Sequence, residues 1–177
     1  LYYLFRAQLL KDMSLRRLFY KLVMPVARMF EDVEEEGLFI NVDRLAEVKK
    51  ELTDQKEKLL DELGRNINWN SPSQISDYLY KTLKLPIIEK TGKGAPSTSE
   101  SVLQRLDHPI PKKLIEYRGI EKNLSTYVVG WEKLMHGDRL YLSTKIHGTV
   151  TGRFASRLHQ VPRNPLIRSL IDAPPGW

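Results

Sequence analysis

The sequence predicts a mainly α-helical protein with a small β component. Two long charged segments, 42–63 and 109–135, carry apolar residues at intervals of seven, which is the narrow stripe of a coiled-coil helix. A glycine follows the first segment and prolines open the second, as expected at helix ends. Only Arg139–His147 reads as a longer strand. With 177 residues and 41% hydrophobic side chains, the chain can bury a real core.

The first forty residues predict two helices and a short extended piece. Residues 1–13 read as the end of an amphipathic helix, and a second helix is expected over Arg17–Glu36, where Pro25 can begin a new segment. Gly37 ends that helix before the extended residues 38–40. The acidic run at 31–36 could be read as metal ligands. This interpretation is disfavoured, because neighbouring helical residues fan around the axis and do not converge on one point.

The two striped helices are expected to pack antiparallel as a stalk about 30 Å long. Asn41 can cap the first helix, and the stripe of the second includes Tyr117, Leu124 and Trp131. The residues that join the two helices would form a small helical tip. In this tip, Asn70–Gln74 starts one short helix, and Ser97 with Glu100 fits a capping box for another.

Charge is segregated along the chain. Residues 1–30 hold six basic and one acidic residue, 31–80 hold six and thirteen, and 139–177 again hold six and one. This pattern suggests one face for a phosphate backbone and another turned to water. In the basic segment Thr149–Ser156, Gly152 allows close approach of the backbone to a polyanion while Arg153 reaches inward. From this segment alone, nucleic-acid binding and a solvated basic loop are about equally supported.

Several kinds of protein are excluded or disfavoured by composition. No apolar run is long enough to span a bilayer, and no signal peptide opens the sequence. The absence of cysteine excludes disulfides and thiolate metal sites, and it suits a cytoplasmic protein. The four histidines are scattered without metal-ligand spacing.

Six segments, in order along the chain, resemble family A DNA polymerases, the bacterial DNA polymerase I type and its phage relatives. These segments are Met24–Gly37, Asn70–Gln74, Gly94–Ser99, the pair Glu116–Gly119 and Ser125–Tyr127 on one helix, Thr151–Arg153 and Ala173–Pro174. The resemblance implies that residues 1–37 are the helical tail of an exonuclease domain or linker, 38–135 the thumb subdomain and 136–177 the N-terminal part of the palm. It also implies a bacterial cytoplasm or a phage-infected host as the location, and a shortened loop after Arg157 favours a viral relative.

The resemblance implies that the protein grips double-stranded primer-template DNA. The expected DNA-binding residues are Asn70, Ser71, Gln74, Arg118, Lys122, Ser125, Thr126, Thr149, Thr151, Gly152, Arg153, Gln160, Arg163 and Arg168. Arg153 matches the family arginine that reads minor-groove acceptors common to all base pairs. Two alternatives stay open. Asn70 and Ser71 can be plain helix caps, and an exposed helix face paired with Glu121 explains Arg118 and Lys122 better from spacing alone.

No catalytic or metal-binding residue is expected in this chain. Nucleotidyl transfer in the family uses two metal ions held by palm aspartates, and the first of these would lie beyond Trp177. The chain alone is therefore expected to bind DNA without extending it, to bind no cofactor, and to need a second chain or C-terminal segment with the palm and fingers. Mg²⁺ is expected in the complete polymerase, which would act in DNA replication or repair. A stand-alone, sequence-independent duplex-binding module is the alternative function, and a helical scaffold with an incidental basic patch is a third.

Overall fold

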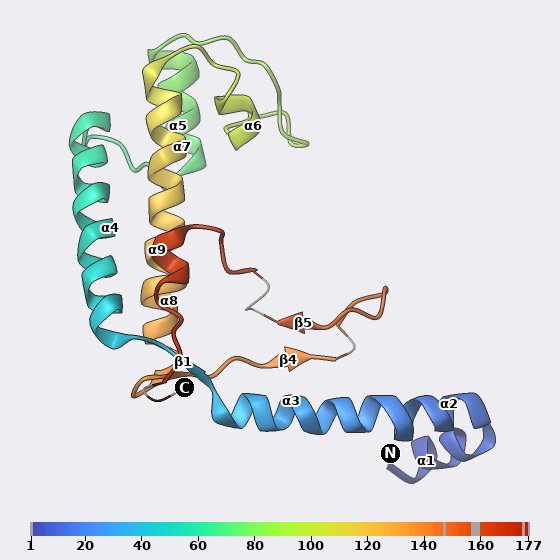
Figure 1. Cartoon of the computed structure of the whole chain (residues 1–177). Coiled ribbons are helices and arrows are strands. Elements are labelled where there is room, and N and C mark those ends of the chain that lie inside the picture. The colour runs from blue at the N-terminus through green and yellow to red at the C-terminus, as the bar shows by residue number, and fades with distance from the viewer. Residues whose placement is uncertain (1, 147, 157–159, 175, 177) are drawn as a thin grey trace. The chain divides into compact units, whose positions relative to one another are not determined.

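A computed structural model describes residues 2–146, 148–156, 160–174 and 176, and these form two compact units (Figure 1). The first unit combines Leu1–Leu45 with Trp131–Trp177, and the second is Ala46–Gly130. Helices dominate both, and the strands are short. The predicted fold class, mainly α with a small β component, is confirmed.

The first unit begins with a helical hairpin. Helix α1 (Tyr2–Lys11) is followed by α2 (Met13–Leu18), the π-helical segment η1 (Phe19–Val23) and α3 (Met24–Glu36). The Asp12 carboxylate caps α2 by accepting the N–H groups of Ser14 and Leu15 at 2.8 and 3.1 Å. The helix predicted from Arg17 therefore starts four residues earlier, at the residue after this cap.

Gly37 ends α3 with a φ of +68°, a conformation that glycine adopts without strain. Its N–H donates to the Val33 carbonyl at 3.2 Å. A β-carbon built on Gly37 would lie 3.0 Å from the ring of Tyr141. The position therefore requires glycine both for the turn and for the close approach of Tyr141.

A three-stranded antiparallel sheet follows, in the order β1 (Leu38–Phe39), β3 (Arg139–Leu140) and β2 (Met135–His136). A separate two-stranded ribbon pairs β4 (Thr144–Lys145) with β5 (Ala155–Ser156). The strand predicted over Arg139–His147 is thus two strands, because the chain changes pairing partner between them. His147 lies outside the described residues.

The C-terminal segment packs against the start of this sheet. Helix α9 (Pro165–Arg168) is capped by Asn164, whose side-chain oxygen accepts the Leu166 N–H at 2.9 Å. Ile171 forms an antiparallel bridge with Ile40, and Ile40, Ile167 and Leu170 are all completely buried. Burial of these apolar side chains stabilises the packing of the two chain segments that make up the first unit.

The regular elements of the second unit are all helical, and an isolated bridge joins Lys90 to Pro96 in one of its loops. It contains most of α4 (Val42–Leu63), followed by α5 (Pro72–Asp77), π-helical η2 (Tyr78–Thr82), α6 (Glu100–Leu103), α7 (Pro109–Lys122) and π-helical η3 (Asn123–Val128). Helix α8 (Val129–Glu132) continues from η3. Asn41 caps α4 as predicted, by accepting the Arg44 N–H at 3.0 Å, and α4 ends before Gly64.

Helices α4 and α7 lie antiparallel, as predicted. Lys56 pairs with Glu121 at 2.6 Å and Glu62 with Lys113 at 2.9 Å, so the later position on α4 meets the earlier position on α7 (Figure 1). The unit also contains a continuous cluster of buried side chains: Leu59, Leu63, Trp69, Ile75, Leu79, Leu103, Leu106, Leu114 and Tyr117. This cluster joins both helices to the tip.

Two local predictions in this unit are wrong. Leu124, expected in the stripe, is only half-buried, whereas Tyr127, outside the predicted stripe, is buried, because the π-helical turn of η3 shifts the phase of the helix. The residue before α6 is Ser99, which makes no side-chain cap, so the capping box at Ser97 does not form. The Ser97 carbonyl instead accepts the Tyr80 hydroxyl at 2.5 Å.

Candidate nucleic-acid interface

The residues predicted to contact DNA fall into four groups on the chain. Two groups lie in the second unit, at the start of α5 and along α7 and η3. The other two lie in the first unit, at the turn between β4 and β5 and around α9. Each group is described within its own unit.

The first group surrounds the start of α5. Ser71 is its N-cap, and its hydroxyl accepts the Gln74 N–H at 3.5 Å. The Gln74 side-chain oxygen accepts the Asn68 N–H at 2.8 Å, which tightens the preceding turn. The Asn70 N–H donates to the Asn68 side-chain oxygen at 3.0 Å, and the Asn70 side chain partly opposes the rise in the Tyr117 pKa that burial causes. All three predicted residues therefore have structural roles, and Asn70 and Gln74 are also exposed.

The second group begins with Arg118, whose guanidinium is committed within the unit. Its Nη1 and Nη2 donate to the carbonyl and hydroxyl of Thr98, at 2.5 and 3.4 Å. Partial burial lowers the pKa of Arg118 from its usual value. Glu121, considered above as its neighbour on the helix, instead pairs with Lys56. The bond from Arg118 to Thr98 is a contact that the sequence pattern did not indicate, since no spacing rule relates the two positions.

Farther along the same helical run, Lys122, Ser125 and Thr126 are exposed. The Glu121 carboxylate beside Lys122 is drawn to Lys56 on α4, whose pKa is raised chiefly by that hydrogen bond. A cation and two hydroxyls are thus presented together on the surface of the second unit, and they can donate to phosphate oxygens.

The third group is the turn that carries Arg153. Gly152 has a φ of +73°, and its N–H donates to the Thr149 carbonyl at 3.2 Å. The Thr149 hydroxyl in turn donates to the Arg153 carbonyl at 2.8 Å, and the Thr151 hydroxyl lies 3.5 Å from that of Thr149. The backbone of the turn is thereby closed on itself. The Arg153 side chain is exposed, and it makes no ion pair or hydrogen bond within the described ranges.

Two contacts fix the hairpin that bears this turn to α3. The Phe30 and Phe154 rings meet edge to face, with centroids 4.9 Å apart and an interplanar angle of 71°. The Glu34 carboxylate accepts the N–H of Thr144 at the start of β4. Neither Phe30 nor Glu34 was predicted to matter. Glu34 could be seen in the sequence only as one member of an acidic run.

The fourth group lies around α9. Arg163 is exposed, whereas the Nε of Arg168 donates to the Pro162 carbonyl at 3.3 Å and so braces the loop before the helix. Gln160 is exposed as well. Arg157 and His159, in the shortened loop, lie outside the described residues.

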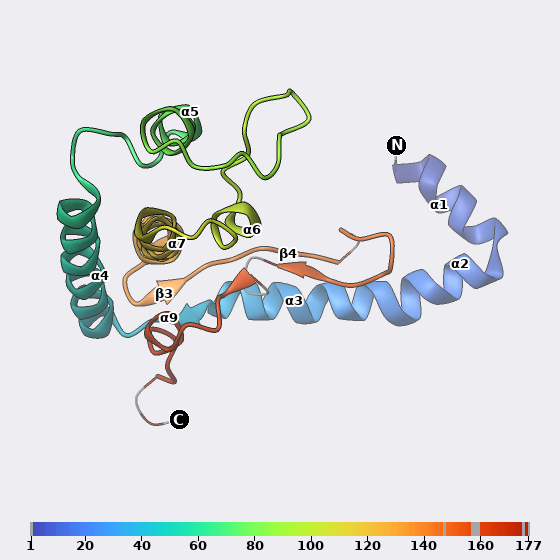
Figure 2. The same ribbon diagram turned by 90° about the horizontal axis from the view of Figure 1, so that it is seen from above.

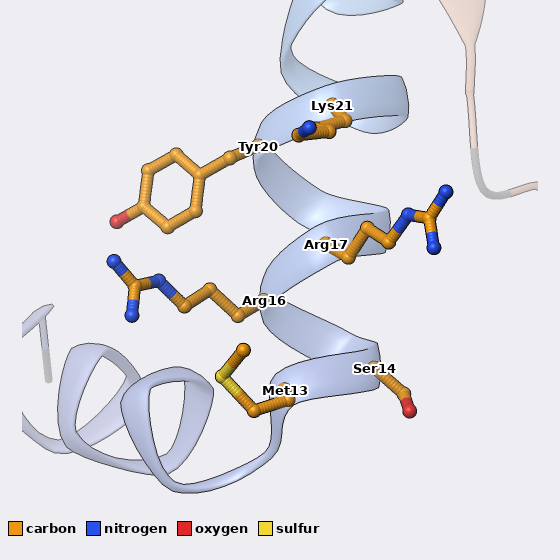
Figure 3. A pocket seen from close by; sticks show the side chains of 6 residues that line it. All are labelled: Met13, Ser14, Arg16, Arg17, Tyr20 and Lys21. Atoms are coloured by element: carbon orange, nitrogen blue, oxygen red, sulfur yellow. The ribbon is translucent and has the colours of Figure 1, made fainter.

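A separate basic hollow lies on α2 and η1. It has a volume of about 700 Å³ and is lined by Met13, Ser14, Arg16, Arg17, Tyr20 and Lys21. Figure 3 shows Arg16 and Tyr20 on the same side of the helix, with Arg17 on the other. The lining named here holds three cations and no carboxylate, so it attracts any polyanion and selects none. Its signal in the sequence was the positive charge of residues 1–30.

No metal site or membrane span is present among the described residues. No group of three histidine, cysteine, aspartate or glutamate side chains there is arranged to hold a metal ion. Likewise, no helix in the described part is both long and apolar enough to cross a bilayer.

Comparison with known proteins relates these features to one family. The model of DNA polymerase family A matches residues 42–174. DNA polymerase I of Bacillus subtilis is 35% identical over 147 residues, and the match covers 78% of this chain and 17% of that protein. The thermostable DNA polymerase I of Thermus caldophilus is 33% identical over 176 residues, covering 90% of this chain and 21% of the relative. The DNA polymerase of Escherichia phage T5 is 31% identical over 189 residues, and the match covers 94% of this chain and 22% of that protein.

The fold is also similar to a solved polymerase. The POL domain of Pol1 from M. smegmatis, in complex with a DNA primer-template and dNTP, superposes with a TM-score of 0.79 at 25% identity. That match covers 89% of this chain and 30% of the other. The chain spans about a fifth of the length of the curated relatives it matches. The family match over most of the chain, together with these relatives, shows that the protein belongs to DNA polymerase family A.

Proposed function

We propose that this chain is the thumb and the first part of the palm of a template-directed DNA polymerase, and that it grips the primer-template duplex. In this proposal, residues 1–37 are the helical tail of an exonuclease domain or linker, 38–135 the thumb and 136–177 the start of the palm. Family membership and the similarity to a polymerase domain bound to primer-template DNA support it.

One observation carries the DNA contact: Arg153 extends, exposed, from a turn whose backbone is held by Thr149. A planar guanidinium on such a turn can enter the minor groove, where acceptors are common to all base pairs. Gly152 leaves the backbone beside it bare, so the turn can approach the duplex closely. Recognition of this kind checks the presence of a paired primer end without selecting sequence.

The remaining groups would contact the phosphate backbone. Lys122, Ser125 and Thr126 on one unit, and Arg163 on the other, are exposed donors. Asn70 and Gln74 would present donors at the tip in addition to their structural bonds. Arg118 would act indirectly, by holding the Thr98 loop in place.

The complete polymerase would supply the chemistry. Family A nucleotidyl transfer needs two Mg²⁺ ions held by aspartates on palm strands, and no acidic residue of this chain matches them. A second chain or a C-terminal segment carrying the palm and fingers would provide these ligands and the nucleotide site. Binding the duplex, rather than extending the primer, is the expected activity of the 177 residues alone.

The DNA contact is tested by replacing Arg153 with alanine. Affinity for a fluorescent primer-template, measured by anisotropy, should fall by about 1–3 kcal/mol if a direct fork contact is lost. Arg28→Ala removes the same charge from an exposed position of α3 outside the predicted site, and it should cost much less. Equal affinities for the Arg153→Ala variant and the parent chain would contradict the contact.

The wider proposal is tested by reconstitution. The chain mixed with a palm-and-fingers fragment of a family A polymerase should extend a primer in the presence of Mg²⁺, and neither component should do so alone. Duplex binding without any restored extension by a folded mixture would favour the stand-alone binding module. Failure to bind DNA even at low salt would favour a helical scaffold.

A further inference from the structure

We propose that Glu34 and Phe30 are positioning residues for Arg153: they fix the hairpin Thr144–Ser156 to α3 without touching DNA themselves. The inference rests on the proposed role of Arg153 in DNA binding and extends it to two residues on a different element.

The hairpin and the helix run beside each other in both views of the molecule (Figures 1 and 2). They are joined at two points by side chains of α3. Phe30 meets Phe154, the residue that follows Arg153, with ring centroids 4.9 Å apart. One helical turn further on, Glu34 accepts the Thr144 N–H at the base of the hairpin. The two contacts therefore hold opposite strands of the same hairpin.

Packing at the tip of the hairpin is too open to fix it. Between the turn and the helical run that leads into α3 lies an open hollow of about 410 Å³, whose lining includes Leu22, Val26, Thr149 and Val150. Val150, at the tip of the turn, is fully exposed. Side chains that line an open hollow lack packed neighbours on one side, so they gain less dispersion energy than they would in a packed core. The ring pair and the carboxylate therefore decide where the turn lies.

The hydrogen bond from Thr144 is well suited to this task. Thr144 pairs with Ser156 in the ribbon, yet its N–H points to Glu34 and not across to β5. A charged acceptor makes a stronger bond than a neutral one. Losing it would remove one of the two contacts described here between α3 and the hairpin. Arg153 would then have to be ordered on binding, which lowers affinity.

Charge and positioning predict opposite effects, and this makes the test sharp. Glu34→Ala removes a negative charge, so electrostatics alone would tighten binding to DNA. A positioning role predicts weaker binding, by about 3–10-fold, from the cost of ordering the hairpin. Glu35→Ala makes the same charge change at the next, exposed residue, and it should leave affinity unchanged or slightly increase it.

The experiment measures anisotropy of a primer-template with the full 177-residue chain and these variants. Glu34→Gln keeps an oxygen acceptor for Thr144 and should recover most of the affinity. Phe30→Ala breaks the other contact and should also weaken binding, and it serves if Glu34→Ala does not fold. Affinities of both Glu34→Ala and Phe30→Ala equal to that of the parent chain would overturn the proposal.

A double-mutant cycle separates positioning from a general loss of structure. In an Arg153→Ala background, Glu34→Ala should cause no further loss, since there is no longer a guanidinium to position. The same loss with and without Arg153 would overturn the proposal. Hydrogen exchange should accelerate at the amides of 144–156 in Glu34→Ala and stay unchanged across 46–130.

The failures of the two proposals are distinguishable. If Arg153→Ala binds primer-template as well as the parent chain, the DNA contact itself is wrong. If Arg153→Ala weakens binding while the Glu34 and Phe30 variants do not, only the positioning role is wrong.

Discussion

The helical second unit and the hairpin Thr144–Ser156 are stabilised in different ways. The second unit is held by a continuous buried cluster that includes Trp69, Leu79 and Leu103, reinforced by ion pairs between α4 and α7. The hairpin has a ring pair, one carboxylate and a closed turn. In the helical unit many contacts each contribute part of the stability. In the hairpin few contacts are made, and polar side chains stay exposed to a ligand.

This difference indicates which substitutions should affect stability and which should affect binding. Loss of a residue in the cluster should lower the free energy of unfolding, because the interior is close-packed. Loss of a hairpin side chain should change binding more than unfolding. Four predictions, in order of decreasing effect, test that distinction.

Trp69→Ala should give the largest loss, about 3–5 kcal/mol of unfolding free energy. Trp69 is 1% exposed, it packs edge to face on Tyr78, and its Nε1 donates to the Gly64 carbonyl at 2.7 Å. Guanidinium denaturation followed by circular dichroism measures the change. Tyr20→Ala, at a half-exposed aromatic of η1, is the control and should change stability by about 0.5 kcal/mol or less. Similar losses in the two variants would show that the cluster is not the main source of stability.

Lys56→Met should lower the free energy of unfolding by about 1–3 kcal/mol, because the Lys56 ammonium lies 2.6 Å from the buried Glu121 Oε2, which has no hydrogen-bond partner of good geometry among the described residues to replace this ion pair. Lys58→Met, at an exposed position of the same helix, is the control. The difference in unfolding free energy between Lys56→Met and the parent chain should become smaller as the pH rises above 10.5. The pKa of Lys56 is raised in the folded state above the ordinary lysine value of 10.5, chiefly by the hydrogen bond to Glu121. The charged side chain therefore contributes fully to stability below pH 10.5, and this contribution is lost as the pH rises through the folded pKa. A gap that is constant up to pH 12 would show that charge is not its source.

Ser71→Ala should cost about 1 kcal/mol through loss of the cap of α5. Ser73→Ala, two residues on and exposed, should cost less and is the matched control. The same two variants report on DNA binding. If Ser71 is only a cap, the DNA affinity of Ser71→Ala should equal that of the parent chain under conditions in which both are fully folded. A loss of affinity without a loss of stability would reveal a direct phosphate contact instead.

Arg153→Ala should have the smallest effect on unfolding, within about 0.5 kcal/mol, since the exposed guanidinium makes no contact in the described part of the chain. The same variant should lose DNA affinity by the amount given above. Thermal denaturation checks the first expectation. A clear drop in melting temperature would show that Arg153 stabilises the fold, and the contrast between hairpin and helical unit would then fail at this residue.

Much of the fold could be predicted because local signals act over a few residues. Asn41 caps the start of α4, Gly64 follows its end in a left-handed conformation that glycine adopts without strain, and Pro109 opens α7. Periodicity predicted the antiparallel pair, but it could not predict the π-helical turn that moves Leu124 out of the stripe. Such a turn depends on the packing of the completed helix.

The site was less predictable because its contacts join distant positions. Arg118 bonds to Thr98 and Glu34 to Thr144, pairs separated by 20 and 110 residues. No spacing rule reaches across such intervals. The resemblance to polymerases indicated Arg153 and the tip residues Asn70, Ser71 and Gln74 as DNA-binding residues. Their role in DNA binding stays a prediction. The division into tail, thumb and palm likewise stays a prediction.

The bond between Glu34 and Thr144 has a consequence for solubility. A two-stranded ribbon has open edges, and an unpaired backbone N–H on such an edge can recruit a strand from another molecule. The carboxylate of Glu34 occupies that donor and places a negative charge beside it. At high protein concentration the same side chain should therefore oppose edge-to-edge aggregation.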